Sequence, residues 1–93
     1  MNVNQIREMK QRGEKSVALV VWDAPTAHIA HQCGADFLIV GDSVGVNLWG
    51  QSNNLEITLD DFLVALKAVR RGAPGALICA DIPYGPVQID PRD

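Results

Sequence analysis

The chain has 93 residues, of which 47% are hydrophobic, and carries a formal net charge of −3. Its size suits one small domain, and this hydrophobic content excludes a disordered chain. The sequence has only one adjacent pair of basic residues, which argues against a nucleic-acid partner. No apolar run is long enough to span a bilayer, which argues against a membrane partner. The amino terminus does not resemble a signal peptide, so we expect a cytoplasmic protein.

The first two expected elements are an amphipathic helix over 3–12 and a strand over 16–22. The helix has apolar residues at helical spacing, and either Asn2 or Asn4 is the expected cap. Gly13 suits a left-handed helix end. The strand is a short apolar run, as expected of a strand in a parallel sheet.

A second helix is expected to begin at Asp23, with Pro25 in its first turn, and to end at Gly34. A second apolar run over 37–40 predicts a buried strand. Residues 41–57 contain glycines and a polar stretch, which predict a long loop. Loops of this length in compact domains are usually functional.

The third helix is expected to start at Thr58, in a variant of the capping box, and to stop at Gly72. A third strand is expected over 76–80. Strands that alternate with helices indicate βαβ units, so the predicted fold class is α/β with a parallel sheet. Three strands are too few to close a barrel, which leaves a small open domain or the first part of a larger one.

Each of the three apolar runs is followed by an aspartate at its carboxyl end. These aspartates are Asp23, Asp42 and Asp81. If the second and third strands are neighbours, about 4.8 Å apart, Asp42 and Asp81 meet at one sheet edge. A hard cation such as Mg²⁺ relieves the repulsion between two carboxylates. The oxygens of a keto acid could complete the coordination shell of the cation, which would then polarise the carbonyl group of the keto acid. Ser43, between flanking glycines, is a candidate to bind a substrate carboxylate.

Simpler readings compete with a metal site. Asp23 precedes a helix start and is interpreted as a cap. Asp81 precedes an Ile-Pro pair, where an Asx-type turn is the alternative. The histidines at 28 and 31 lack a third ligand and are expected on the surface, whereas Trp49 and Tyr84 either line a pocket or pack. Without an export signal, the cysteines at 33 and 79 are expected to be reduced core thiols.

Four segments, in this order and spacing, resemble the amino-terminal third of the ketopantoate hydroxymethyltransferase family. They are 40–45 (VGDSVG), 55–60 (LEITLD), 68–74 (AVRRGAP) and 80–85 (ADIPYG). The first and third of these are specific in combination. The chain departs from the usual family pattern at Trp22, where the family commonly has tyrosine, and in the loop stretch before Ile57.

The resemblance implies that this chain is part of a (β/α)8 barrel of the phosphoenolpyruvate mutase/isocitrate lyase superfamily. It implies transfer of a hydroxymethyl group from 5,10-methylenetetrahydrofolate to 3-methyl-2-oxobutanoate, for pantothenate and coenzyme A synthesis. By position, it implies that Asp42 and Asp81 ligate Mg²⁺, and that Asp42, Ser43 and Asp81 contact the keto acid. Family members form homo-oligomers, so the full-length protein is expected to do the same.

The third metal ligand, the substrate-carboxylate lysine and the catalytic base of the family would lie beyond Asp93. Residues 1–93 are therefore expected to form a single partial barrel domain, truncated after its third strand and inactive alone. Two alternatives stay open. One is another Mg²⁺-dependent keto-acid lyase or mutase of the same superfamily, suggested by the altered loop, and the other is a non-catalytic fragment or assembly module.

Overall fold

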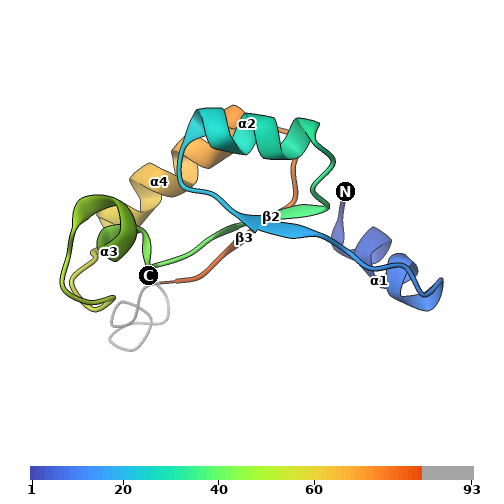
Figure 1. Cartoon of the computed structure of the whole chain (residues 1–93), viewed down its shortest axis with the longest axis horizontal. Coiled ribbons are helices and arrows are strands. Elements are labelled where there is room, and N and C mark those ends of the chain that lie inside the picture. Colours follow the sequence, from blue (N-terminus) through green and yellow to red (C-terminus); the bar gives the residue numbers. More distant parts are fainter. Residues whose placement is uncertain (83–93) are drawn as a thin grey trace.

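The computed structural model describes residues 1–82, which form an α/β arrangement (Figure 1). The elements in chain order are α1 (Val3–Gln11), β1 (Ala18–Val20), α2 (Ala24–Gln32), β2 (Phe37–Val40), α3 (Val44–Trp49), α4 (Leu59–Gly72) and β3 (Ile78–Ala80). The expected alternation of strands and helices is therefore confirmed over the described residues.

The three strands form one parallel sheet in the order β1-β2-β3. Leu38 of β2 pairs with Leu19 on one side and with Ile78 on the other, and Val40 pairs with Ala80. The second and third strands are therefore neighbours, as required for Asp42 and Asp81 to lie at one edge of the sheet.

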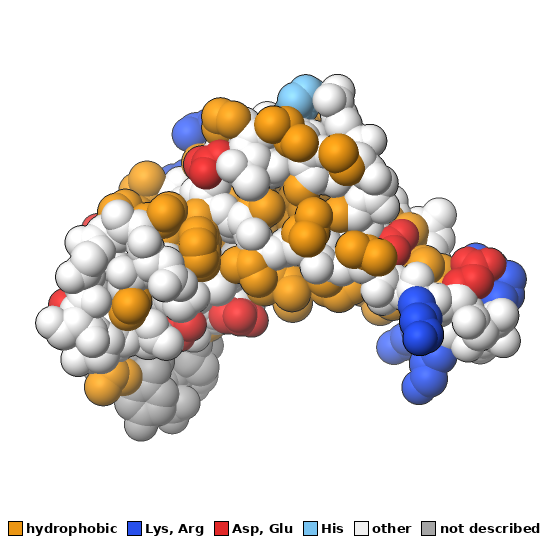
Figure 2. All heavy atoms as spheres, viewed as in Figure 1, with side chains coloured by type: hydrophobic (Ala, Val, Ile, Leu, Met, Phe, Trp, Pro, Cys, Tyr) orange, Lys and Arg blue, Asp and Glu red, His pale blue; other side chains and the backbone are white. Residues whose placement is uncertain are grey.

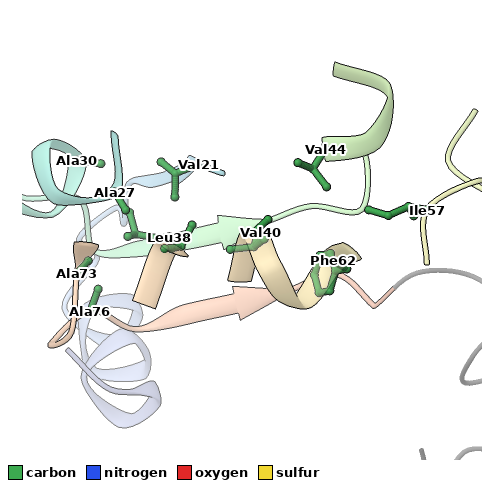
Figure 3. Close-up of a cluster of buried hydrophobic side chains, with 12 residues drawn as sticks. Val21, Ala27, Ala30, Leu38, Val40, Val44, Ile57, Phe62, Ala73 and Ala76 are labelled. Carbon is green, nitrogen blue, oxygen red and sulfur yellow. The ribbon is translucent and has the colours of Figure 1, made fainter. Parts of the chain in front are cut away.

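Helices α2 and α4 lie side by side over one face of the sheet (Figure 1). Leu38 and Val40 of the central strand point toward them and are fully buried. Figure 3 shows this cluster between the strands and the helices. Its members are Val21, Ala27, Ala30, Leu38, Val40, Val44, Ile57, Phe62, Ala65, Val69, Ala73 and Ala76. The described residues therefore contain one continuous core, which lies on one side of the sheet.

The opposite face of the sheet is open. Side chains alternate along a strand, so Phe37 and Ile39 face away from the helices, and both are only half-buried. Cys79 pairs with Ile39 and is exposed on the same face, as is Val20 on β1. Helix α1 lies at one end of this face and leaves a groove of about 250 Å³, lined by Val3, Ile6, Phe37, Leu77, Ile78 and Cys79.

The predicted helix caps are confirmed. Asn2, not Asn4, caps α1 and forms a capping box with Gln5. Asp23 caps α2 through the backbone N–H of Thr26. Thr58 accepts from the backbone N–H of Asp61 at the start of α4, but the reciprocal bond of a capping box is not among the hydrogen bonds of residues 1–82. Such caps are local in sequence, which is why pattern alone predicts them.

Residues 41–57 were expected to form one long loop. The structure differs, because this stretch contains α3. Val44 and Gly45 at the start of this helix are buried against the rest of the chain, and burial of this short apolar segment favours a helix there. Gly50 ends it with a φ of 71°, a left-handed conformation that glycine adopts without strain.

The other helices and strands lie close to their expected positions. The strand over 37–40 matches β2, whereas β1 and β3 are shorter than expected, because only residues 18–20 and 78–80 pair with β2. Helix α4 stops at Gly72, as expected, and this residue packs against Ala24 at the start of α2. None of the helices in residues 1–82 has both the length and the apolar character needed to cross a bilayer.

Candidate functional site

The candidate site lies where β2 and β3 end. Strand β2 leads into Gly41, Asp42 and Ser43, and β3 leads into Asp81. The backbone N–H of Asp81 donates to the carbonyl of Val40 at 2.9 Å, so the pairing of the two strands continues to the candidate residues. Ligands of open α/β sheets commonly bind outside this end of the strands.

Gly41 brings Ser43 and Asp81 together. A methyl group built onto its Cα would lie 3.5 Å from the Ser43 hydroxyl oxygen and 3.6 Å from Oδ2 of Asp81. The hydroxyl and the carboxylate therefore flank the same glycine, although they come from different strand ends. Gly41 itself is buried, so both polar groups border a backbone position with no side chain of its own.

Asp42 and Ser43 are half-buried, whereas Asp81 is exposed. Ser43 occupies the cap position of α3, but its side chain makes no capping hydrogen bond. Its backbone carbonyl accepts from Asn47 instead, at 2.9 Å. The Ser43 hydroxyl is therefore not committed to the helix, and it can donate to a ligand at the strand ends.

Trp22 also contacts this edge of the sheet. Its indole Nε1–H donates to the carbonyl oxygen of Gly41 at 3.2 Å, and the side chain is half-buried against the core. In the sequence, Trp22 stands out only as a departure from a family pattern, and it is not among the predicted site residues. A tryptophan at the end of a strand, beside a strand that ends in glycine, is the signal that could have indicated it.

Asp23, the third strand-end aspartate, does not belong to this group. Its carboxylate accepts from the backbone N–H of Thr26 at 2.7 Å and so caps α2. Hydrogen bonds from the Thr26 backbone and hydroxyl stabilise the charged form and hold the pKa of Asp23 below its usual value. The interpretation of Asp23 as a cap is thus confirmed.

The oxygen donors at the strand ends suit a hard cation. Mg²⁺ in proteins is typically held by one or two carboxylates, with substrate oxygens and water in the other positions. Within residues 1–82, no three His, Cys, Asp or Glu side chains are grouped closely enough to hold a metal. Of the three predicted site residues, the structure brings Ser43 and Asp81 together beside Gly41, and Asp42 lies between Gly41 and Ser43 in the chain.

Charges are unevenly distributed over the surface. Figure 2 shows lysine and arginine side chains gathered over α1, and acidic side chains at the lower edge, on the side where α3 lies. The histidines at 28 and 31 are exposed on α2, as expected for surface residues. Cys33 and Cys79 are free, as expected, but both are exposed, so their prediction as core thiols is wrong.

The loop beyond the candidate site packs back on α3. Trp49, with 45% of its surface exposed, lines a cavity of about 290 Å³ together with Gln51, Asp61 and Val64. The amide oxygen of Gln51 is buried against Gly45 and has no hydrogen-bond partner among residues 1–82. Trp49 therefore borders a pocket, one of the two alternatives for it, whereas Tyr84 lies outside the described residues.

Comparison with known proteins identifies a family. The family model described as ketopantoate hydroxymethyltransferase matches residues 1–93. Proteins named 3-methyl-2-oxobutanoate hydroxymethyltransferase from Thermotoga neapolitana and Thermosipho africanus are 44% and 43% identical over 84 residues, which is 90% of this chain and 31% of each relative. A relative of the same name from Geobacter sulfurreducens is 44% identical over 88 residues, 95% of this chain and 33% of its own length.

The chain thus spans about a third of the length of these relatives. The match covers the whole sequence, including both strand-end segments and the loop between them. It confirms the family that the motifs predicted, and it is independent of the geometry of the strand ends. This chain belongs to the ketopantoate hydroxymethyltransferase family.

Proposed function

We propose that this chain supplies part of the active site of an enzyme that transfers a hydroxymethyl group to 3-methyl-2-oxobutanoate. In the overall reaction, 5,10-methylenetetrahydrofolate, the keto acid and water give tetrahydrofolate and 2-dehydropantoate. The names of the relatives support the activity. The observation that carries the proposal is the pair of oxygen groups, from Ser43 and Asp81, that both lie close to where a side chain on Gly41 would begin.

In this proposal, Asp42 and Asp81 hold Mg²⁺. Their carboxylates end neighbouring strands, and two like charges at one sheet edge favour a cation between them. A bound Mg²⁺ would polarise the 2-oxo group of the substrate and so make its C3 proton more acidic. The two aspartates also orient that oxo group, since a keto acid contributes its own oxygens to the shell.

Ser43 has a separate proposed role. Its hydroxyl is half-buried, is not used to cap α3 and lies beside Gly41, where a ligand can approach the backbone closely. We assign it to the carboxylate of the keto acid, to which it donates a hydrogen bond. Fixing both ends of the 2-oxo acid would hold C3 in one orientation for deprotonation and attack on the one-carbon unit.

The remaining groups are proposed to come from residues outside this sequence. A third metal ligand, a lysine for the substrate carboxylate and the base that removes the C3 proton have no candidates at the strand ends of residues 1–82. We propose that residues 1–93 form the first part of a (β/α)8 barrel. The parallel sheet with helices on one face, and the one-third coverage of the relatives, support this.

The proposal is tested by substituting each carboxylate in the full-length protein that carries this sequence. Asp42→Asn and Asp81→Asn each keep the side-chain shape but remove the charge. Each is expected to weaken Mg²⁺ binding by roughly 10–100-fold or more, because even partners that only support a metal ligand contribute that much. Calorimetric titration with Mg²⁺, together with assays of 2-dehydropantoate formation at several Mg²⁺ concentrations, measures the effect.

Asp60→Asn is the matched control, because Asp60 is an exposed aspartate in the first turn of α4. It should bind Mg²⁺ as the wild type does. Wild-type Mg²⁺ affinity in both Asp42→Asn and Asp81→Asn would overturn the site assignment. Turnover of the keto acid without 5,10-methylenetetrahydrofolate would instead favour a lyase or mutase of the same superfamily over a hydroxymethyltransferase.

A further inference from the structure

We propose that Trp22 is a positioning residue for the cation site, an inference that rests on the proposed function. The indole Nε1–H of Trp22 donates to the carbonyl oxygen of Gly41 at 3.2 Å, across 19 residues of sequence. The bond joins the end of β1 to the residue immediately before Asp42. Trp22 does not reach the proposed ligands itself and acts through the backbone.

The Gly41 carbonyl matters because it shares a planar peptide unit with the N–H of Asp42. Turning that carbonyl turns the whole unit and moves the Cα of Asp42. The carbonyl accepts a second hydrogen bond, from the backbone N–H of Val44 at 3.3 Å. It is thus held from two sides, by β1 through Trp22 and by the first turn of α3 through Val44.

Trp22 is well suited to hold this carbonyl in one direction. The indole has a single donor and no acceptor, so its hydrogen bond has one possible polarity. The ring is half-buried against the core, and the preceding Val21 is tied to β2 by a backbone hydrogen bond from its N–H to Ile39 at 3.0 Å. A ring fixed in this way holds the peptide between Gly41 and Asp42 in a constant position relative to β1.

Glycine at position 41 makes such support necessary. Gly41 has no side chain to restrict its own backbone, and Ser43 and Asp81 flank it. Without the indole N–H, the bond from Val44 would be the one hydrogen bond to that carbonyl from residues 1–82. We therefore expect loss of the donor to broaden the orientations of Asp42 and to weaken the site without removing any ligand.

The test is Trp22→Phe in the full-length protein, with Trp49→Phe as the matched control. Both variants exchange indole for benzyl, but Trp49 is an exposed residue of α3 with no hydrogen bond to the strand ends. Trp22→Phe is expected to raise the apparent dissociation constant for Mg²⁺ by roughly three- to ten-fold, as expected for the loss of one neutral hydrogen bond. Turnover at saturating Mg²⁺ should stay close to the wild-type value.

Thermal unfolding in a chelator separates positioning from a general loss of stability. The inference holds if Trp22→Phe and Trp49→Phe unfold at similar temperatures and only Trp22→Phe loses Mg²⁺ affinity. Equal Mg²⁺ affinity in the two variants overturns it, and so does a large fall in the unfolding temperature of Trp22→Phe alone. Loss of Mg²⁺ binding in Asp42→Asn and Asp81→Asn, with unchanged binding in Trp22→Phe, would refute only the role of Trp22.

Discussion

At the scale of single residues, aspartates that look equivalent in the sequence have different roles because their neighbours differ. Asp23 immediately precedes α2 and caps it, whereas Ser43, not Asp42, holds the cap position of α3, and Asp81 follows β3. The carboxylate of Asp23 is satisfied by Thr26, so it is not available to a ligand. Local hydrogen bonding thus separates a structural aspartate from two candidate ligands.

We predict that Asp23→Ala destabilises the full-length protein by about 0.5–2 kcal/mol at neutral pH, the usual contribution of a cap. Because the Thr26 bonds lower the pKa of Asp23 in the folded state, its charge contributes stability above the unfolded-state pKa. That contribution is lost as pH falls through the lower, folded-state pKa. Denaturant unfolding between pH 7 and pH 3 measures both effects.

Asp23→Asn is the informative control, since an amide oxygen still accepts from the N–H of Thr26 but does not titrate in this range. It should keep most of the stability at neutral pH, and its stability should fall less than that of the wild type on acidification. Identical acid sensitivity in the wild type and in Asp23→Asn would refute the cap as a source of pH dependence.

At the scale of elements, the packing of α2 against α4 depends on a glycine at the end of α4. A methyl group on Gly72 would overlap the backbone of Ala24, with its Cα at 2.8 Å and its carbonyl oxygen closer still. The contact is backbone against backbone, so no flexible side chain can move aside. The two helices cover the sheet together, and their separation therefore affects the whole core.

We predict that Gly72→Ala destabilises the protein by about 1–3 kcal/mol, the usual cost of overpacking, although alanine is the better helix former. Gly75→Ala is the matched control, because a methyl group there has His31 as its nearest neighbour, at 3.9 Å. Denaturant unfolding of both variants provides the comparison. Equal stability of the two variants would mean that α2 and α4 do not need the close approach at Gly72.

At the scale of the whole molecule, the apolar surface is distributed unequally between the two faces of the sheet. One face is covered by α2 and α4, and the other carries half-buried or exposed residues such as Ile39 and Val20, the latter 53% exposed. Strand β3 has a partner on one side only within residues 1–82. An open apolar face beside an edge strand is a surface on which chains associate.

We predict that the 93-residue chain, produced by itself, self-associates as its concentration rises and unfolds over a broad temperature range. Sedimentation and circular dichroism melts measure these properties. Val20→Lys, on the open face, should reduce the association, whereas Val64→Lys, at a 65% exposed position of α4, should not. A monomeric chain with a sharp melt would show that residues 1–93 fold independently.

The sequence by itself determined the helices and strands of residues 1–82 other than α3, their order, and the caps of α2 and α4. Helical spacing and strand-length apolar runs are local patterns, and a cap such as Asp23 contacts a residue three positions away. The positions of Asp42, Ser43 and Asp81 at strand ends follow from the same patterns. The family motifs in the sequence were likewise sufficient to predict the family that comparison confirmed.

Only the tertiary structure decided which strands are neighbours and which side chains meet. The contact of Trp22 with Gly41 and the approach of Gly72 to Ala24 join residues far apart in the sequence. The pattern of apolar and polar residues does not indicate that these residues meet. Helix α3 is a similar case, because burial of Val44 and Gly45 outweighs the loop-like composition around it. Such features depend on packing between distant segments, which local patterns do not encode.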